Sequence, residues 1–267
     1  MQLSNVVARA RGKARRMLAS GLARRTVPLG EAGPIISFTF DDAPKTAFDA
    51  GRRILARHGA RATYFVSLAL IDTETEVGRI GSPADLKSAV ADGCELGCHT
   101  YDHLDAWHVS TATYLVSIER NREALERMLP GARFDSFAYP KSGATLAVKA
   151  GLGPRFKGAR GGGQAANLGT ADLNLVKACF LDRRAGVDMA LVRALVDETV
   201  RGRGWLVFAT HDIAADPSPY GCTPEFLEAV AECSRRSGAL LLPFAEACGV
   251  IQPRGAEGTE RASAGVG

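Results

Sequence analysis

Hydrophobic and polar residues along this chain are arranged in blocks that predict strands separated by helices. Short runs rich in β-branched and aromatic residues predict strands at residues 34–43, 62–68, 95–100, 135–140, 153–160, 174–182, 204–212 and 239–243. The spacing of apolar residues predicts helices at residues 46–58, 110–129 and 187–201. The pairs Ser82-Pro83 and Thr223-Pro224 predict two further helix starts, because in each a capping hydroxyl precedes a proline at the first helical position.

Strands that alternate with helices predict a mostly parallel sheet with helices outside it. Seven or eight such units in about 220 residues favour a distorted, closed (β/α)7–8 barrel over an open doubly wound sheet. The composition, 46% hydrophobic and 23% charged over 267 residues, is typical of a globular chain with a substantial core. We therefore expect a single α/β barrel domain at residues 31–251, followed by a disordered tail at 252–267 that is rich in glycine, alanine and serine.

Basic residues are concentrated at the start of the chain. Residues 1–30 contain seven of the 33 basic residues and none of the 29 acidic ones, which leaves 26 basic against 29 acidic residues elsewhere. Apolar residues recur between these arginines with a helical period, which is typical of an amphipathic helix on an anionic membrane surface. A poorly ordered extension, or a solvated helix that caps the domain, is the alternative. We expect no nucleic acid partner, because the segment lacks aromatic residues for base stacking.

The chain shows no sign of export or of a membrane span. No stretch approaches 18 consecutive apolar residues, and the basic leader lacks the uninterrupted apolar run of a cleaved secretion signal. Without an export signal, the six cysteines are expected to be reduced thiols. We therefore expect a cytoplasmic protein that associates peripherally with the inner membrane surface through its basic N-terminus.

Polar residues follow the carboxyl ends of the predicted strands, which open on one face of a parallel barrel where catalysis is found. These residues are Asp41, Asp42, His99, Pro140, Lys141, Asp182, His211 and Asp212. His99 and His103 are four residues apart and can converge on one ion. With a third ligand from elsewhere, positions would remain open for water and substrate, as in a catalytic zinc site. Asp41 and Asp42 are adjacent on a strand and point different ways, so one can bind a metal while the other acts as a base.

Each of these signals also has an ordinary structural interpretation. The aspartates resemble a helix N-terminal pair, and the two histidines are compatible with a surface loop. Their combination with a His-Asp pair after another strand favours a metal site. A structural zinc site that combines Cys94 and Cys98 with the histidines is disfavoured, because Cys98 and His99 would point to opposite faces of a strand.

Four segments in order resemble the motifs of the polysaccharide deacetylase family, also known as carbohydrate esterase family four. They are residues 39–44 (Thr-Phe-Asp-Asp-Ala-Pro), 95–103 (Glu-Leu-Gly-Cys-His-Thr-Tyr-Asp-His), 137–140 (Phe-Ala-Tyr-Pro) and 208–212 (Phe-Ala-Thr-His-Asp). The resemblance covers residues 34–245. It implies a distorted (β/α) barrel, one divalent metal, usually Zn²⁺ and sometimes Co²⁺, and hydrolysis of an N-acetyl group.

Roles for individual residues follow from the resemblance. It implies that Asp42, His99 and His103 bind the metal, that Asp41 is the general base, and that His211 is the general acid. A metal of this kind polarises the amide carbonyl and lowers the pKa of a bound water. The histidine would then protonate the departing amine.

The third motif is expected to contact the substrate but departs from the family pattern. The resemblance implies that Tyr139, Pro140 and Lys141 lie at the substrate, with the backbone N–H of Lys141 directed at the oxyanion. Many members have a tyrosine where Lys141 stands, and an arginine that orients the base where Ala138 stands. A backbone donor survives the first change, whereas the second requires a replacement.

We expect the residues after the predicted strand 174–182 to supply that replacement. Arg183 or Arg184 would provide the missing charge, and Asp182 would tune His211. Asp212 is expected to support the same site.

The expected function is metal-dependent hydrolysis of an N-acetyl group on an amino sugar of a polysaccharide, oligosaccharide or lipid-linked glycan. One alternative is a deformylase or another amide hydrolase that acts on a small substrate. The other is a catalytically impaired carbohydrate-binding relic, suggested by Ala138. Retention of the five metal-binding and catalytic positions weighs against the relic.

Overall fold

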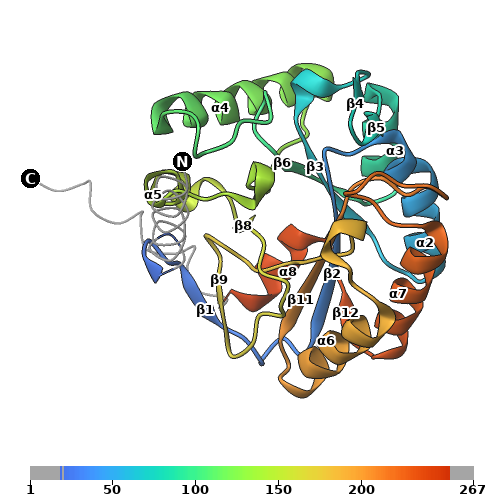
Figure 1. The fold of residues 1–267 in the computed structure, drawn as a ribbon. Coiled ribbons are helices and arrows are strands. Elements are labelled where there is room, and N and C mark those ends of the chain that lie inside the picture. Colours follow the sequence, from blue (N-terminus) through green and yellow to red (C-terminus); the bar gives the residue numbers. More distant parts are fainter. Residues whose placement is uncertain (1–18, 20, 253–267) are drawn as a thin grey trace, which may run out of the picture.

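A curled parallel sheet with helices around it forms the body of the protein (Figure 1). The computed structural model describes residue 19 and residues 21–252. Seven strands pair side by side in parallel, in the order β10 (Cys179–Phe180), β11 (Trp205–Thr210), β2 (Ile35–Asp41), β3 (Ala62–Val66), β6 (Glu95–Cys98), β7 (Ser136–Ala138) and β8 (Gly158–Arg160). A short strand, β12 (Leu240–Leu241), adds to the start of β2.

The two ends of this sheet meet. A parallel bridge joins Arg160 in β8 to Val176, and the chain continues from Val176 directly into β10. The amide of Gly161 donates to the carbonyl of Val176 (2.9 Å), and the amide of Gln164 donates to the carbonyl of Ala178 (3.0 Å). The predicted distorted barrel is therefore confirmed, although the closing strands are much shorter than the sequence pattern suggests.

Strand β2 shows how the sequence directs polar side chains into the barrel. Phe38 and Phe40 face outward and belong to the hydrophobic core beneath the surrounding helices. Ser37 and Thr39 alternate with these residues and face inward, where the hydroxyl of Ser37 accepts a hydrogen bond from the indole of Trp205 (3.0 Å). Because strand side chains alternate, Asp41 also faces the interior, at the carboxyl end of the strand.

Helices cover the outside of the sheet. They are α2 (Arg52–Arg57), which follows the π-helical turn η1 (Ala47–Gly51), α3 (Pro83–Ala91), α4 (Thr111–Met128), α5 (Leu146–Leu152), α6 (Met189–Arg201), α7 (Pro224–Arg236) and α8 (Phe244–Ile251). The helix starts predicted at Ser82 and Thr223 are confirmed, since both hydroxyls accept an amide hydrogen bond. Within the described residues, no helix is long and apolar enough to cross a membrane.

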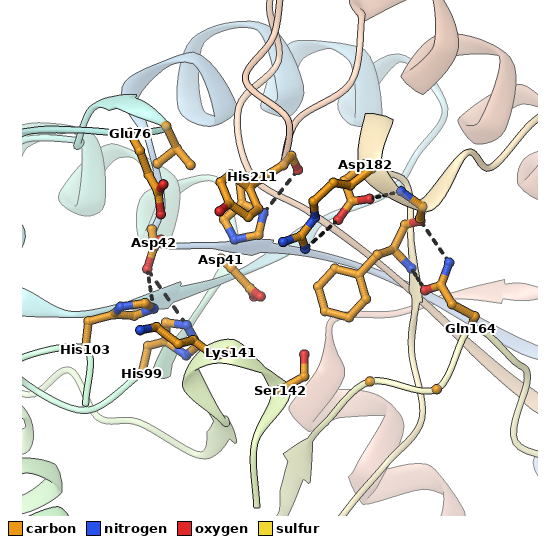
Figure 2. Close-up of a pocket in the computed structure, with 17 residues that line it drawn as sticks. Asp41, Asp42, Glu76, His99, His103, Lys141, Ser142, Gln164, Asp182 and His211 are labelled. Atoms are coloured by element: carbon orange, nitrogen blue, oxygen red, sulfur yellow. Dashed lines mark hydrogen bonds and ion pairs between the residues drawn. The ribbon is translucent and has the colours of Figure 1, made fainter. Parts of the chain in front are cut away.

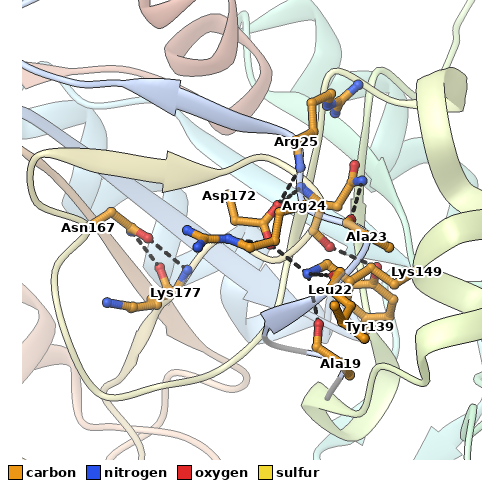
Figure 3. Close-up of polar contacts among 11 residues, drawn as sticks. Ala19, Leu22, Ala23, Arg24, Arg25, Tyr139, Lys149, Asn167, Asp172 and Lys177 are labelled. Atoms are coloured by element: carbon orange, nitrogen blue, oxygen red, sulfur yellow. Dashed lines mark hydrogen bonds and ion pairs between the residues drawn. The ribbon is translucent and has the colours of Figure 1, made fainter. Parts of the chain in front are cut away.

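Part of the predicted N-terminal extension belongs to the folded body. Strand β1 (Thr26–Pro28) pairs antiparallel with β9 (Thr170–Asp172), and the preceding residues are held by a buried lysine (Figure 3). The Lys149 ammonium donates to the carbonyls of Ala19 (2.8 Å) and Leu22 (2.9 Å) and to the carboxylate of Asp172 (2.6 Å). The boundary expected at residue 30 therefore lies too late. The proposed amphipathic helix, like most of the expected tail, falls outside the described residues.

Candidate active site

A pocket of about 590 Å³ opens at the carboxyl ends of the strands. Its lining includes Asp41 and Asp42 from the end of β2, His99 and His103 from the loop after β6, and His211 from the end of β11. Figure 2 shows these side chains around one shared space. Parallel strands therefore bring together the five residues to which the sequence analysis gave metal-binding or acid-base roles.

Asp42, His99 and His103 form a compact group of three ligand atoms. The Asp42 Oδ1 atom lies 3.3 Å from Nε2 of His103 and 3.8 Å from Nε2 of His99. One ligand atom from each residue can be chosen so that all three lie within 4.8 Å of one another. Two imidazole nitrogens and one carboxylate oxygen are the donor set of a catalytic zinc-type site.

The hydrogen bonding and burial of these three residues favour the binding of a cation. The Nδ1–H of His99 donates to the carbonyl of Ala138 (2.8 Å), which leaves Nε2 as the lone-pair atom directed at Asp42. Burial lowers the pKa of His99 to about 4, so its imidazole is neutral and able to bind a metal at neutral pH. Within the described part of the chain, the buried Oδ1 of Asp42 has no hydrogen-bond partner. A buried, unsatisfied carboxylate oxygen facing two imidazole nitrogens fits one divalent metal.

Backbone strain is concentrated around the pocket. Asp42 (φ 57°), His103 (φ 52°) and Lys141 (φ 55°) adopt the left-handed conformation, which is unfavourable for residues other than glycine. All three line the pocket. Strained conformations of this kind persist where the surrounding structure holds a functional geometry in place.

A buried arginine holds Asp41, but it is neither of those expected. The Nη2 of Arg160, at the end of β8, donates to Oδ1 of Asp41, and both side chains are buried. Its Nη1 donates to the carbonyl of Gly161 (3.1 Å), and the guanidinium lies near the rings of Phe65 and Phe180. Arg160 therefore supplies the charge that the family arginine would provide at Ala138.

The expectation for Arg183 and Arg184 is wrong for a geometric reason. Both belong to the short helix η5 (Arg183–Ala185) at the pocket rim, and each forms its ion pair there. Arg183 binds Asp216 (3.0 Å), and Arg184 contacts Asp182 (3.4 Å). Arg160 ends a predicted strand, so the strand-end criterion would have found it.

The charges around Asp41 determine its protonation. Burial by itself would raise the pKa of this carboxyl group. The charge of Arg160, followed by the contributions of His99 and His211, outweighs burial and leaves the pKa below its usual value. Asp41 is therefore ionised and able to accept a proton.

His211 is oriented by its backbone neighbours. Its Nδ1 lies 3.1 Å from the carbonyl of Tyr220, which can only accept, so Nδ1 carries a proton and Nε2 remains for the pocket. Asp212 fixes this loop, because its carboxylate accepts hydrogen bonds from the amide (2.8 Å) and hydroxyl of Ser218. Asp212 therefore supports His211 only indirectly, through the loop that follows it.

Asp182 lines the pocket, but its carboxylate accepts a hydrogen bond from the amide of Ala185 (2.6 Å). No contact between Asp182 and His211 is found among the described residues, so the expected tuning of His211 by Asp182 is not seen.

The third motif is only partly directed at the pocket. Lys141 lies in its lining, within the short helix η3 (Pro140–Ser142), next to Ser142. Tyr139 and Pro140 are buried outside the lining, and the Tyr139 hydroxyl donates to the carbonyl of Asn174 (2.9 Å). The expectation that these two side chains contact substrate is therefore corrected: packing turns them away from the pocket.

Several pocket residues had no signal in the sequence. Glu76 and Val77 lie in the turn of a small hairpin formed by β4 (Glu74–Thr75) and β5 (Gly78–Arg79). Phe180, Gln164 and Tyr220 come from β10 and from loops. Ordinary loop residues of this kind are recruited by tertiary structure, which local patterns do not encode.

Part of the chain is similar in sequence to known deacetylases. Residues 30–152 match the model of the polysaccharide deacetylase family. A chitin deacetylase from Colletotrichum lindemuthianum is 32% identical over 117 residues, which are 41% of this chain and 46% of that protein. The match thus spans about half the length of this relative.

Solved structures share the fold. The chitin deacetylase of the same fungus has a TM-score of 0.56 at 18% identity, covering 83% of this chain and 89% of that one. A family 4 acetyl xylan esterase from Clostridium thermocellum, in complex with a cobalt ion, has a TM-score of 0.56 at 19% identity, with coverages of 79% and 89%. A peptidoglycan deacetylase from Bacillus subtilis has a TM-score of 0.52 at 17% identity, with coverages of 82% and 91%.

Proposed function

We propose that this protein is a metal-dependent hydrolase that removes the N-acetyl group from an amino sugar of a glycan. The match of residues 30–152 to the polysaccharide deacetylase family model supports this proposal. The observation that carries the proposal is the arrangement of two aspartates. The unsatisfied Oδ1 of Asp42 faces two imidazole nitrogens, while the adjacent Asp41 is held ionised by Arg160. A metal-binding carboxylate beside a free base is the pairing that hydrolysis of an amide requires.

In the proposed reaction, each of the pocket residues has a separate role. Asp42, His99 and His103 would hold the metal, most simply Zn²⁺, which supplies a Lewis acid and a water of lowered pKa. Asp41 accepts the proton of the attacking water as its oxygen bonds to the amide carbon. The backbone N–H of Lys141 would stabilise the oxyanion. In its imidazolium form, with protons on both ring nitrogens, His211 delivers the Nε2 proton to the nitrogen as the C–N bond breaks, which releases acetate and the free amine.

The contact between Arg160 and Asp41 argues against the alternative of a catalytically impaired relic. That alternative arose from alanine at position 138, which leaves the base without its usual arginine. Arg160 fills this role from the neighbouring strand β8, and its side chain is fully buried. Both charges of the pair are consequently positioned before substrate arrives.

Acetate release from N-acetylglucosamine oligomers tests the proposal. We expect the wild-type protein to release acetate, and Asp41→Asn to be slower by a factor of about 10² to 10⁴, the usual contribution of a general base. Asp216→Asn, which alters an exposed acid outside the pocket, serves as the control. Formate release from N-formyl sugars without acetate release would instead favour the deformylase alternative. Equal rates for the wild type and Asp41→Asn would contradict the mechanism.

A further inference from the structure

Arg184 lies in the pocket without a part in holding the base. Its guanidinium lies 4.3 Å from the centre of the Tyr220 ring and contacts the buried carboxylate of Asp182 at 3.4 Å. Its backbone amide donates to the carbonyl of Pro219 (3.1 Å). The side chain is nevertheless 59% exposed, so a fixed cation is presented to whatever enters the pocket.

Arg184 lies on the side of the pocket where the sugar, and not the acyl group, is expected to bind. The ring of Tyr220 lies against that of His211, with centroids 5.5 Å apart, and the carbonyl of Tyr220 accepts the Nδ1–H of His211. Arg184, Tyr220 and His211 are therefore in contact in that order and form one wall of the pocket. Under the proposed function, His211 protonates the amine that stays on the sugar. The wall that carries Arg184 consequently faces the sugar.

The acids of the pocket leave much of the Arg184 guanidinium available. Asp41 is paired with Arg160, and Asp42 belongs to the metal group. Asp182 is shared, because its other oxygen accepts the Ala185 amide that caps η5. Among the described residues, Asp182 is the only hydrogen-bond partner found for the Arg184 side chain, and it engages one of the five N–H groups.

Other charges in the pocket also bear on an incoming anion. Lys141 lines the pocket as a second cation. Glu76 lines it as an exposed acid on the hairpin turn near Asp42 (Figure 2). A guanidinium with free N–H groups is best matched by the two oxygens of a carboxylate or phosphate.

We propose that Arg184 binds a carboxylate or phosphate carried by the N-acylated sugar or its neighbour, so that the enzyme prefers an anionic glycan to a neutral one. This inference rests on the proposed function, which places the sugar against the wall of Arg184, Tyr220 and His211. Arg184 is thus a specificity-determining residue and takes no part in the proton transfers.

The kinetic test compares kcat/KM for a neutral N-acetylglucosamine oligomer with that for an oligomer in which N-acetylglucosamine alternates with glucuronate. In Arg184→Gln we expect the acidic-to-neutral ratio of kcat/KM to fall about tenfold, mainly through KM, because a charge-assisted pair is lost. Arg184→Lys should retain part of the preference. Arg183→Gln is the matched control, since this neighbouring arginine pairs with exposed Asp216 outside the pocket lining and should leave the ratio unchanged.

A binding measurement keeps the test independent of turnover. Calorimetric titration compares glucosamine, glucosamine 6-phosphate and glucuronate, and separates phosphate from carboxylate recognition. We expect the wild type to bind at least one anionic sugar about tenfold more tightly than glucosamine, and Arg184→Gln to lose that difference. Absence of a preference in the wild type, or equal losses on neutral and acidic ligands in Arg184→Gln, would overturn the inference. Absence of hydrolysis with a retained anion preference would overturn only the proposed function.

Discussion

At the scale of single residues, the proposed base depends on one buried ion pair. Arg160 and Asp41 come from strands that are not neighbours in the sheet, and their side chains meet inside the barrel. An unpaired carboxylate that is this deeply buried would be costly, because burial removes most of its contact with water. The pair therefore keeps Asp41 ionised and also fixes its direction.

Loss of this pair should reduce turnover more than loss of either rim arginine. We expect Arg160→Gln to lower kcat about 100-fold or more, because a general base must be both ionised and positioned. Arg160→Lys should recover part of the rate, since it restores the charge but not the second guanidinium contact, which is made to the carbonyl of Gly161. Rates of acetate release, measured beside thermal unfolding curves, separate positioning from simple unfolding. Normal turnover in a folded Arg160→Gln protein would contradict the role given to Arg160.

The sequence was most informative where chemistry follows a strand end. Asp41, Asp42, His99 and His211 could be predicted because the carboxyl ends of parallel strands meet on one face. Contacts across the barrel could not be predicted in the same way. The partner of Asp41 lies 119 residues away, and the direction of the Tyr139 side chain depends on its hydrogen bond to Asn174.

At the scale of elements, the segment before β2 is fastened by Lys149. This lysine lies in α5, and its fully buried ammonium joins two carbonyls of the N-terminal segment to Asp172 at the end of β9. The other carboxylate oxygen of Asp172 accepts the amides of Arg25 and Asn174 at 3.0 Å. One buried ion pair therefore links three elements that are distant in sequence.

Replacing this lysine should destabilise the fold. Lys149→Met leaves the buried carboxylate without its main partner, so we expect the free energy of unfolding to fall by about 3–5 kcal/mol. Lys87→Met, at an exposed position on α3, is the matched control and should change it by less than about 0.5 kcal/mol. Denaturant titration monitored by circular dichroism measures both variants. Equal stability of the two would show that the cluster contributes little.

Local patterns explain which elements were predicted. Helices α3 and α7 begin with a hydroxyl cap and proline, and α4 has a long apolar period, so each was found. Helices α5 and α8 have seven and eight residues, too few for a periodicity to stand out. The pairing of β1 with β9 was missed because its register depends on residues about 145 positions apart.

At the scale of the whole molecule, the folded domain begins before the region that matches the family model. That match starts at residue 30, whereas Ala19 and Leu22 already bind Lys149. We expect a protein without residues 1–18 to keep its stability and its turnover of soluble oligomers. A protein without residues 1–29 loses β1 and the two carbonyls that Lys149 binds, so its unfolding midpoint should fall. Identical midpoints for the two truncations would contradict this boundary.

The basic charge of residues 1–30 leads to a separate proposal. We propose that this segment binds anionic membranes and thereby brings the pocket close to a surface glycan or a lipid-linked one. The full chain should sediment with vesicles that contain phosphatidylglycerol and be released by high salt, whereas a protein without residues 1–18 should remain in solution. Equal sedimentation of both proteins would remove the support for this proposal.

The dependence of acetate release on a metal tests the account most directly. The wild-type protein is treated with a chelator, dialysed, and assayed on N-acetylglucosamine oligomers before and after one equivalent of Zn²⁺ or Co²⁺ per chain is returned. We predict that chelation abolishes acetate release, that one equivalent restores it, and that Asp42→Ala neither retains the metal nor recovers activity. Full acetate release from a chain shown by elemental analysis to contain no metal would contradict the account.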